Sequence, residues 1–151
     1  MDKRAARPQA RAAARRSVAA GAPPAGAADV QRLGGPALRT FFRIADAWGL
    51  SGEQARTLLG NPPRSTFYEW KKQGPASLPR DTLERISYLL GIYKALQILL
   101  PDERAADRWI RQANAAPPFG GGSALQRMLS GNVADLYAVR QYLDAERGGW
   151  G

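Results

Sequence analysis

The sequence predicts an all-α protein, and three observations lead to this prediction. From Leu38 onward, apolar residues recur at intervals of three and four, which is the spacing of one face of an α-helix. No stretch alternates β-branched and polar residues in the manner of a strand. Ser, Pro, Asn and Gly divide the apolar segments at positions typical of helix starts and ends. We therefore expect a bundle of short helices.

The composition of the chain excludes several classes of function. The 151 residues include 22 Lys and Arg against 13 Asp and Glu, a formal net charge of +9, and they include no His and no Cys. Disulfides, Cys- or His-ligated metals and Ser-His catalysis are therefore excluded, and we expect no metal and no cofactor. No run of about 18 apolar residues exists, so we expect no membrane segment. We also expect the protein to be cytoplasmic. The positive charge suits a polyanionic partner.

Residues 1–36 are expected to be a disordered basic tail. They carry seven basic and two acidic residues, and they contain no Phe, Trp, Tyr or Ile. Such a segment buries too little apolar surface to offset the entropy of ordering it. Three roles remain open: a solvated tail, an arm that contacts DNA phosphates, and a targeting segment suggested by Arg15-Arg16.

Residues 37–78 are expected to form a helix-turn-helix region. A first helix over 38–48 ends at Gly49, and Ser51 to Gln54 is a capping-box pattern that opens a short second helix. Gly60 ends that helix in the left-handed conformation that glycine adopts cheaply. A third helix over 64–73 follows the turn Asn61-Pro62-Pro63, which is about one residue longer than is usual in this motif.

The helix over 64–73 carries the residues that we expect to contact DNA. Short polar and cationic side chains at its start suit base edges and phosphates in a major groove about 12 Å wide. Glu69 opposes this role because its charge has the sign of a phosphate. The alternative is a helix-turn-helix that only packs or dimerises. The predicted DNA-binding residues are Arg64, Ser65, Thr66, Tyr68, Lys71 and Lys72.

The remaining helices are predicted by similar signals. Pro79 to Asp81 opens the longest helix, over 80–100, which is apolar on two sides and is expected to be the central spine. A helix over 103–114 follows Pro101-Asp102. A second capping box, Ser123 to Gln126, opens a short helix, and Asn132 precedes a last one. Residues 147–151 are expected to be a flexible end.

The C-terminal half carries a series of motifs in order. They are Leu90-Gly91-Ile92-Tyr93-Lys94-Ala95-Leu96, Trp109-Ile110 with Ala113-Asn114, Phe119-Gly120-Gly121-Gly122-Ser123-Ala124-Leu125 with Met128, Val139-Arg140 with Tyr142-Leu143-Asp144, and Arg147-Gly148-Gly149-Trp150. With these motifs, residues 38–151 resemble the Xre/MbcA/ParS family of antitoxins. Ala113 and Ala124 stand where the family's motif often has proline.

This resemblance implies a partner and a mechanism. Residues 79–151 would be a domain that binds a RES-domain toxin, an enzyme that degrades NAD or transfers its ADP-ribose. The C-terminal region would cover the toxin's NAD site, and the helix-turn-helix would repress the shared operon by binding operator DNA. The complex would be a hetero-oligomer with two or more copies of each chain.

The resemblance also indicates which residues bind the toxin. Four apolar residues of the set listed below are more often core residues than interface residues, since aromatic side chains at helical spacing usually pack inward. Trp150 differs because it follows two glycines and has little of its own domain to pack against. We hypothesise that Arg147 or the terminal carboxylate makes the polar contact in the NAD site, with Arg147 in the place of the pyrophosphate. A frayed end is the alternative. The predicted toxin-binding residues are Trp109, Asn114, Phe119, Leu125, Met128, Arg140, Arg147 and Trp150.

These inferences favour a non-enzymatic antitoxin. A stand-alone helix-turn-helix transcriptional regulator, whose C-terminal half dimerises, is the second interpretation. An enzyme that uses carboxylates such as Asp102 and Glu103 is the third. We disfavour it because acidic residues are ordinary in the first turn of a helix, where the helix dipole favours them.

Overall fold

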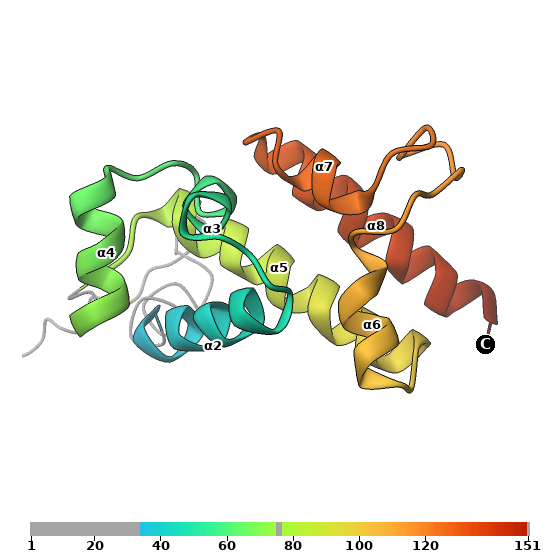
Figure 1. Cartoon of the computed structure of the whole chain (residues 1–151), viewed down its shortest axis with the longest axis horizontal. Coiled ribbons are helices and arrows are strands. Elements are labelled where there is room, and N and C mark those ends of the chain that lie inside the picture. Colours follow the sequence, from blue (N-terminus) through green and yellow to red (C-terminus); the bar gives the residue numbers. More distant parts are fainter. Residues whose placement is uncertain (1–33, 75–76, 151) are drawn as a thin grey trace, which may run out of the picture. The chain divides into compact units, whose positions relative to one another are not determined.

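The computed structural model describes residues 34–74 and 77–150, with the side chains of Gly149 and Trp150 left aside. These ranges contain seven helices and no strand, so the all-α prediction is confirmed (Figure 1). The residues of the predicted tail up to Leu33 lie outside the described part. The helices are α2 (Gly34–Ala47), α3 (Gly52–Leu58), α4 (Arg64–Gln73), α5 (Arg80–Leu99), α6 (Glu103–Trp109), α7 (Ala124–Met128) and α8 (Val133–Trp150).

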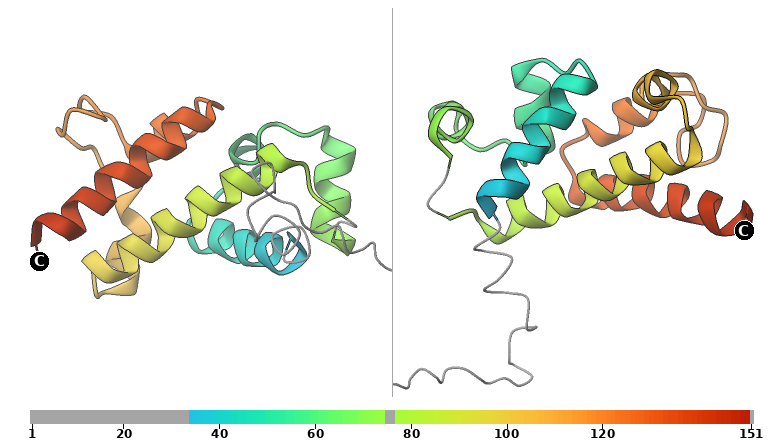
Figure 2. Two further views of the ribbon diagram at one scale, coloured as in Figure 1. Left: turned by 180° about the vertical axis from the view of Figure 1, so that it is seen from behind. Right: turned by 90° about the horizontal axis from the view of Figure 1, so that it is seen from below.

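Helix α5 is the central element, as the sequence predicts. Its 20 residues span about 30 Å at 1.5 Å per residue. It packs against α2, α6 and α8, and Figure 2 shows α8 running alongside it in both views. Its buried residues include Ile86, Leu89, Ile92 and Leu96, which recur at helical spacing. One helix therefore supports both the helix-turn-helix and the C-terminal helices.

A single hydrophobic core joins these helices. Phe41 of α2 and Phe67 of α4 are fully buried at one end, and Met128 and Leu136 are buried at the other. Phe42 packs edge-on against Phe67 with 5.6 Å between ring centroids, which ties α2 to α4. The position of α4 is thus set by aromatic packing on its inner side, and its outer side stays free.

Both predicted capping boxes are present. The hydroxyl of Ser51 accepts from the amide of Gln54 at 3.1 Å, and the Gln54 side chain accepts from the amide of Ser51 at 2.9 Å. Ser123 and Gln126 make the same pair of bonds at the start of α7. These bonds satisfy amide groups that a helix start would otherwise leave without partners. The start of each short helix is therefore fixed locally.

Two helix boundaries differ from those predicted. The first helix includes Gly34, Gly35 and Pro36, which the sequence assigned to the tail. Proline is tolerated there because the first turn of a helix needs no amide donor. The helix predicted over 103–114 ends at Trp109. The carbonyl of Ile110 instead accepts from the amide of Leu125 at 2.8 Å, so the chain leaves the helix to meet α7.

The prediction of a flexible end at 147–151 was wrong for the residues that the structure describes. Helix α8 continues through Arg147 to Trp150, while Gly151 lies outside the described part. Two glycines cost a helix about 1 kcal/mol each relative to alanine, which does not prevent it from continuing. The Arg147 guanidinium lies 4.0 Å from the Asp144 carboxylate one turn earlier, an attraction that favours the helical form.

None of the helices in the described ranges has the length and apolar character that crossing a lipid bilayer requires.

Candidate functional site

The turn between α3 and α4 explains how one extra residue is accommodated. Gly60 has a φ of +95° and Asn61 a φ of +58°, so two consecutive residues are left-handed. Asparagine tolerates this conformation better than most residues. The backbone N–H of Asn61 also donates to the carbonyl of Arg56 at 3.0 Å. Pro63 then stands at the N-cap of α4 and supplies no side-chain cap. The N–H groups in the first turn of α4 therefore have no side-chain cap.

Three charged side chains meet where α3 and α4 begin. Nε and Nη2 of Arg64 donate to the two carboxylate oxygens of Glu53 at 3.3 and 3.1 Å. Nη2 of Arg56 donates to the same carboxylate at 2.9 Å, and its Nη1 donates to the carbonyl of Pro62 at 2.8 Å. These hydrogen bonds lower the pKa of Glu53 from 4.5 to about 2, with Arg64 the larger cause and Arg56 the next. Glu53 is therefore ionised throughout the neutral range.

The other predicted DNA-binding residues lie along the same helix. Arg64, Tyr68, Lys71 and Lys72 are exposed, and their spacing of four, seven and eight residues places them on one face of α4. We call these four residues the basic strip. Ser65 is exposed beside it, and Thr66 is half-buried.

Two contacts hold members of the basic strip against their neighbours. The Tyr68 ring lies against Gly52 of α3. A side chain at position 52 would place its Cβ atom only 2.6 Å from the Tyr68 hydroxyl, so glycine is needed there to make room for the ring. The Lys71 ammonium lies 6.0 Å from the centre of the Phe42 ring, within reach of a cation–π attraction. Within residues 34–74 and 77–150, Lys71 and Lys72 form no ion pair. Their charges remain available to an anionic partner.

The C-terminal half holds a cluster of three aromatic rings. Trp109 of α6 stacks on Tyr142 of α8 at 6.3 Å between centroids, with 17° between the ring planes. Phe119, from the loop between α6 and α7, meets both rings edge-on, at 5.9 Å from Trp109 and 5.1 Å from Tyr142. Two predicted toxin-binding residues, Trp109 and Phe119, thus join the loop to the two helices.

Asn114 fixes the start of that loop. Its side-chain oxygen accepts from the amide of Ala116 at 2.9 Å, and its backbone exchanges hydrogen bonds with Gly121 and Gly122 at 2.8 and 2.9 Å. Side chains of this type stabilise turns by bonding to the backbone two residues later. Arg127 holds the other side, since its guanidinium donates to the carbonyl of Pro118 and to Asp135. The loop is therefore rigidly framed.

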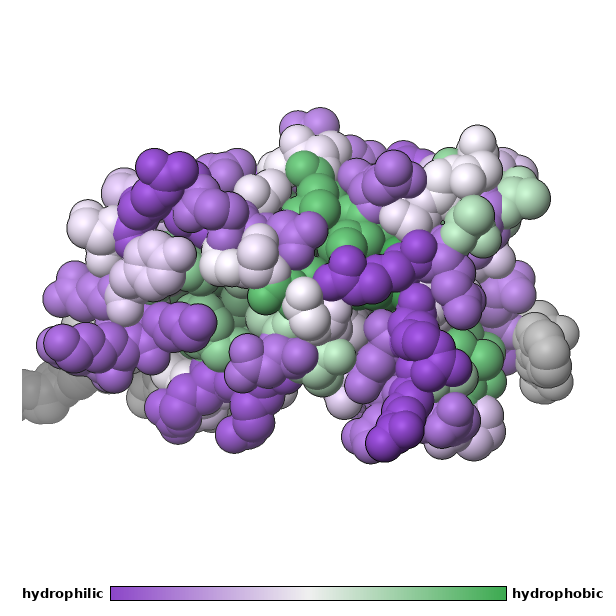
Figure 3. Space-filling view, in the orientation of Figure 1, coloured by the Kyte–Doolittle hydropathy of each residue, from purple (hydrophilic) through white to green (hydrophobic). Residues whose placement is uncertain are grey.

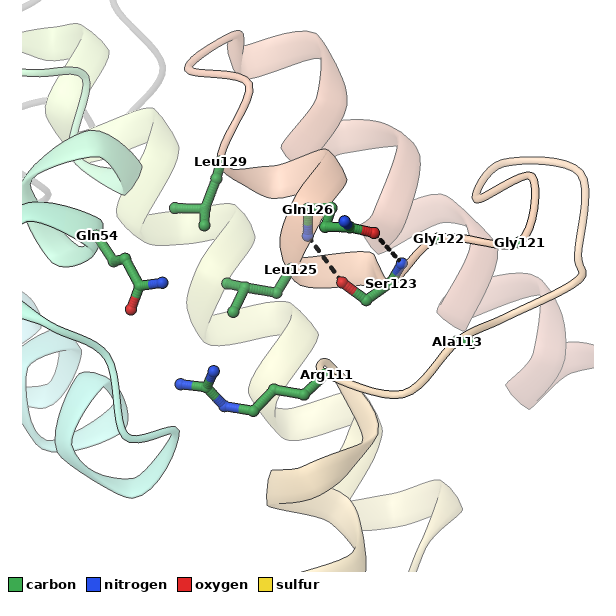
Figure 4. Close-up of a pocket in the computed structure, with 9 residues that line it drawn as sticks. All are labelled: Gln54, Arg111, Ala113, Gly121, Gly122, Ser123, Leu125, Gln126 and Leu129. Atoms are coloured by element: carbon green, nitrogen blue, oxygen red, sulfur yellow. Dashed lines mark hydrogen bonds between the residues drawn. The ribbon is translucent and has the colours of Figure 1, made fainter.

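Leu125 and Met128, also predicted to bind the toxin, are core residues of α7. Beside them lies a pocket of about 360 Å³ whose lining includes Gln54 of α3, Arg111, Leu125 and Leu129 (Figure 4). Figure 3 shows hydrophobic surface in the middle of this face, between the positions of α3 and α7 in Figure 1. Leu129 is partly buried at its edge.

The last two described candidates lie on α8. Arg140 donates to Asp144 at 3.0 Å and crosses α5 at Gly91, where the missing side chain leaves room for it. Arg147 lines an open groove of about 650 Å³ together with Asp144, Gly148, Ile98 and Leu99. We call these five residues the C-terminal groove. Ile98 is 51% exposed, the highest fraction among the exposed large apolar side chains of the described residues. Trp150 belongs to the helix, but its side chain is not among those described.

Sequence reasoning missed two arginines that join the two halves. Nε of Arg111 donates to the carbonyl of Trp48 at 3.3 Å, and its Nη2 donates to the carbonyls of Trp48 and Gly49, both at 2.9 Å. Buried Arg85 donates to Asp81 at 2.8 Å and to the carbonyl of Gly131 at 2.9 Å. The sequence offers one signal for Arg85: it is a charged residue that stands among the regularly spaced apolar residues of α5.

Asp102 and Glu103, the candidate catalytic carboxylates, belong to neither the basic strip nor the C-terminal groove. Asp102 and Glu103 are exposed at the start of α6. Further along α6, burial raises the pKa of Asp107, and the charge of Glu103 raises it further. The side-chain amide of Gln97 donates to Asp107 at 3.4 Å. These contacts are those of an ordinary helix surface.

Comparisons with known proteins agree with this architecture. Residues 27–91 match the antitoxin Xre-like helix-turn-helix domain, and residues 95–149 match the antitoxin Xre/MbcA/ParS C-terminal toxin-binding domain. The chain is also similar to the "Uncharacterized protein y4oB" of Sinorhizobium fredii (strain NBRC 101917 / NGR234). The two are 57% identical over 112 residues, which cover 74% of this chain and 84% of the relative. The chain therefore belongs to the Xre/MbcA/ParS family of antitoxins, with an Xre-like helix-turn-helix domain followed by a toxin-binding domain.

Proposed function

We propose that this antitoxin neutralises a RES-domain toxin that degrades NAD or transfers its ADP-ribose, by covering the toxin's NAD site with its C-terminal region. The observation that supports this most directly is the C-terminal groove, where exposed Ile98 lies beside Arg147 on the last turns of α8. An apolar side chain left open next to a cation suits a partner site that binds an anionic cofactor.

The eight predicted toxin-binding residues divide into two groups in this proposal. Arg140, Arg147 and Trp150 contact the toxin directly in this proposal. The side chains of Arg140 and Arg147 are partly exposed on α8, and Trp150 is the last described residue of that helix. The other five act by shaping the surface, because they are packed in the aromatic cluster, the framed loop or the core. These five are Trp109, Asn114, Phe119, Leu125 and Met128.

An NAD-turnover assay tests this function. A RES-domain protein encoded beside this chain is purified alone and with it, and NAD consumption is measured at equimolar ratio. We expect co-purification, a complex mass that requires two or more copies of each chain, and loss of NAD consumption. Undiminished turnover in a stable mixture would contradict the proposal. If the chain instead purifies as a homodimer that ignores the RES-domain protein, the stand-alone regulator is the better interpretation.

A second function, repression of its own operon, is supported by the basic strip. Its four exposed residues share one face of α4, and the cations Lys71 and Lys72 have no ion pair within the described residues. Binding of the chain to a duplex from the region upstream of its coding frame should weaken steeply as salt rises. Lys72→Ala should reduce the slope of log affinity against log salt by about 0.9. An unchanged slope in Lys72→Ala would show that Lys72 does not contact a DNA phosphate.

A further inference from the structure

Glu53 is an acidic side chain of α3 that pairs with Arg64 at the predicted DNA-contacting end of α4. It is the second residue of α3, and Arg64 is the first residue of α4, so the two helix starts meet at this pair. The Arg64 side chain is 70% exposed and that of Glu53 is 49% exposed. An exposed arginine ordinarily samples many orientations, but here two hydrogen bonds to one carboxylate fix the plane of its guanidinium group.

Arg56 is the second arginine that contacts the Glu53 carboxylate. It contacts the same Glu53 carboxylate at 2.9 Å, while its other terminal nitrogen is held by the carbonyl of Pro62 in the turn. The Glu53 carboxylate is thereby anchored to α3 and to the turn rather than to Arg64 alone. Within the described residues, Nη1 of Arg64 makes no hydrogen bond, so one edge of the guanidinium group stays free for a ligand.

We propose that Glu53 is a positioning residue that makes DNA recognition selective, by holding Arg64 in one orientation and by opposing contacts with phosphates elsewhere. This inference rests on the proposed DNA-binding function. A fixed guanidinium group loses little conformational freedom when it meets a correctly placed acceptor, but it cannot turn toward one placed otherwise. The negative charge of Glu53 also weakens attachment to any polyanion, whatever its sequence. Both effects raise the ratio of specific to non-specific affinity.

Glu69 provides a matched control. It is exposed on α4, the same helix as Arg64, and it forms no ion pair with any described residue. Glu69→Gln and Glu53→Gln remove the same charge from the same surface, but only Glu53→Gln releases Arg64. Any difference between the two variants therefore reports the contacts of Glu53 with Arg64 and Arg56 and not the net charge, and the cycle with Arg64 below isolates the part that depends on Arg64.

The test measures the affinity of the full chain for two duplexes of equal length. One is taken from the region upstream of the coding frame, and the other has the same base composition in scrambled order. We expect Glu69→Gln to tighten binding to both duplexes by a similar factor, which leaves their affinity ratio unchanged. Glu53→Gln should tighten binding to the scrambled duplex and lower the ratio by about tenfold, the scale of one well-placed arginine contact.

A double-mutant cycle separates positioning from general disruption of the fold. Arg64→Lys keeps the charge but loses the two-bond geometry, so it should lower the ratio about as much as Glu53→Gln. Combining the two should cause little further loss, because both remove the same arrangement. The Nε–H signal of Arg64 in an NMR spectrum should be protected from exchange in the wild type and in Glu69→Gln, and exposed in Glu53→Gln.

The outcomes separate this inference from the function on which it rests. A wild-type chain that binds both duplexes equally would overturn sequence-specific DNA binding, and the role of Glu53 with it. A wild type that prefers the upstream duplex, with Glu53→Gln and Glu69→Gln giving the same ratio, would overturn the positioning role alone. Fully additive losses in the cycle would do the same.

Discussion

The guanidinium group of Arg140 in α8 lies directly over the backbone of Gly91 in α5. A Cβ atom at position 91 would be 1.8 Å from Nη1 and 2.4 Å from Cζ of Arg140, distances that real atoms do not adopt. Glycine costs the interior of a helix about 1 kcal/mol relative to alanine, so this residue carries a penalty within α5. The room that it leaves lets Arg140 cross α5 and still pair with Asp144.

Gly91→Ala should therefore separate stability from partner binding. Alanine favours the helix by up to about 1 kcal/mol, and the flexible end of Arg140 can move aside, so the free energy of unfolding should change by less than about 1 kcal/mol. The displaced Arg140 should weaken toxin binding. Gly35→Ala in α2 is the control, because its new Cβ would meet Arg39 only at an ordinary 3.5 Å. Thermal unfolding and toxin titration check both; unchanged toxin affinity in Gly91→Ala would contradict a role for Arg140.

Arg111→Ala should loosen the attachment of the helix-turn-helix to the C-terminal half. The variant loses three charge-assisted hydrogen bonds to the carbonyls of Trp48 and Gly49, which directly follow α2. We therefore expect a loss of about 1–2 kcal/mol in the free energy of unfolding. Arg108→Ala is the matched control, since this exposed α6 residue has no ion pair within the described residues. Equal denaturation midpoints for the two variants would show that the Arg111 contacts contribute nothing.

The stability of the helix-turn-helix should fall in acid because of Glu53. Its pKa is lowered from 4.5 to about 2 in the folded chain, so folding favours the ionised form. This contribution is fully present above pH 4.5 and is lost as the pH falls toward 2. The unfolding midpoint should therefore drop across this window in the wild type and less so in Glu53→Gln. The lowered pKa of Asp135, whose main cause is a hydrogen bond from Ser130, adds a loss common to both proteins. Parallel curves would contradict the pairing of Glu53.

Met128→Ala tests whether a predicted toxin-binding residue acts through the core. Met128 is 1% exposed, so the truncation leaves a cavity and should cost about 2–5 kcal/mol in the free energy of unfolding. Toxin affinity should then fall only in proportion to the fraction unfolded at the assay temperature. A large loss of affinity in a fully folded variant would mean that Met128 itself reaches the toxin.

The sequence predicts those parts of the fold that depend on local chemistry. The two capping boxes and the left-handed Gly60 are specified within four or five residues, and each was predicted at its position. The end of α6 was not predicted. It depends on a hydrogen bond from Leu125, a residue 15 positions beyond the Ile110 carbonyl. Local propensity cannot indicate such a partner.

The candidate sites show the same division. The basic strip follows from helical spacing alone, so the side of α4 that carries it was predictable. The roles of Arg111 and Arg85 depend on carbonyl groups more than 40 residues away, and no local pattern marks those groups. The groove beside Ile98 likewise forms only because the last turns of α8 lie beside the end of α5.

The measurement that tests the central claim most directly is NAD consumption by the proposed RES-domain partner in the presence of a chain that lacks residues 147–151. The claim is that the end of α8 closes the NAD site while the rest of residues 79–151 holds the toxin. The truncated chain should therefore still co-purify with the toxin but leave most of its NAD turnover intact. Complete inhibition by the truncated chain at equimolar ratio would contradict the claim.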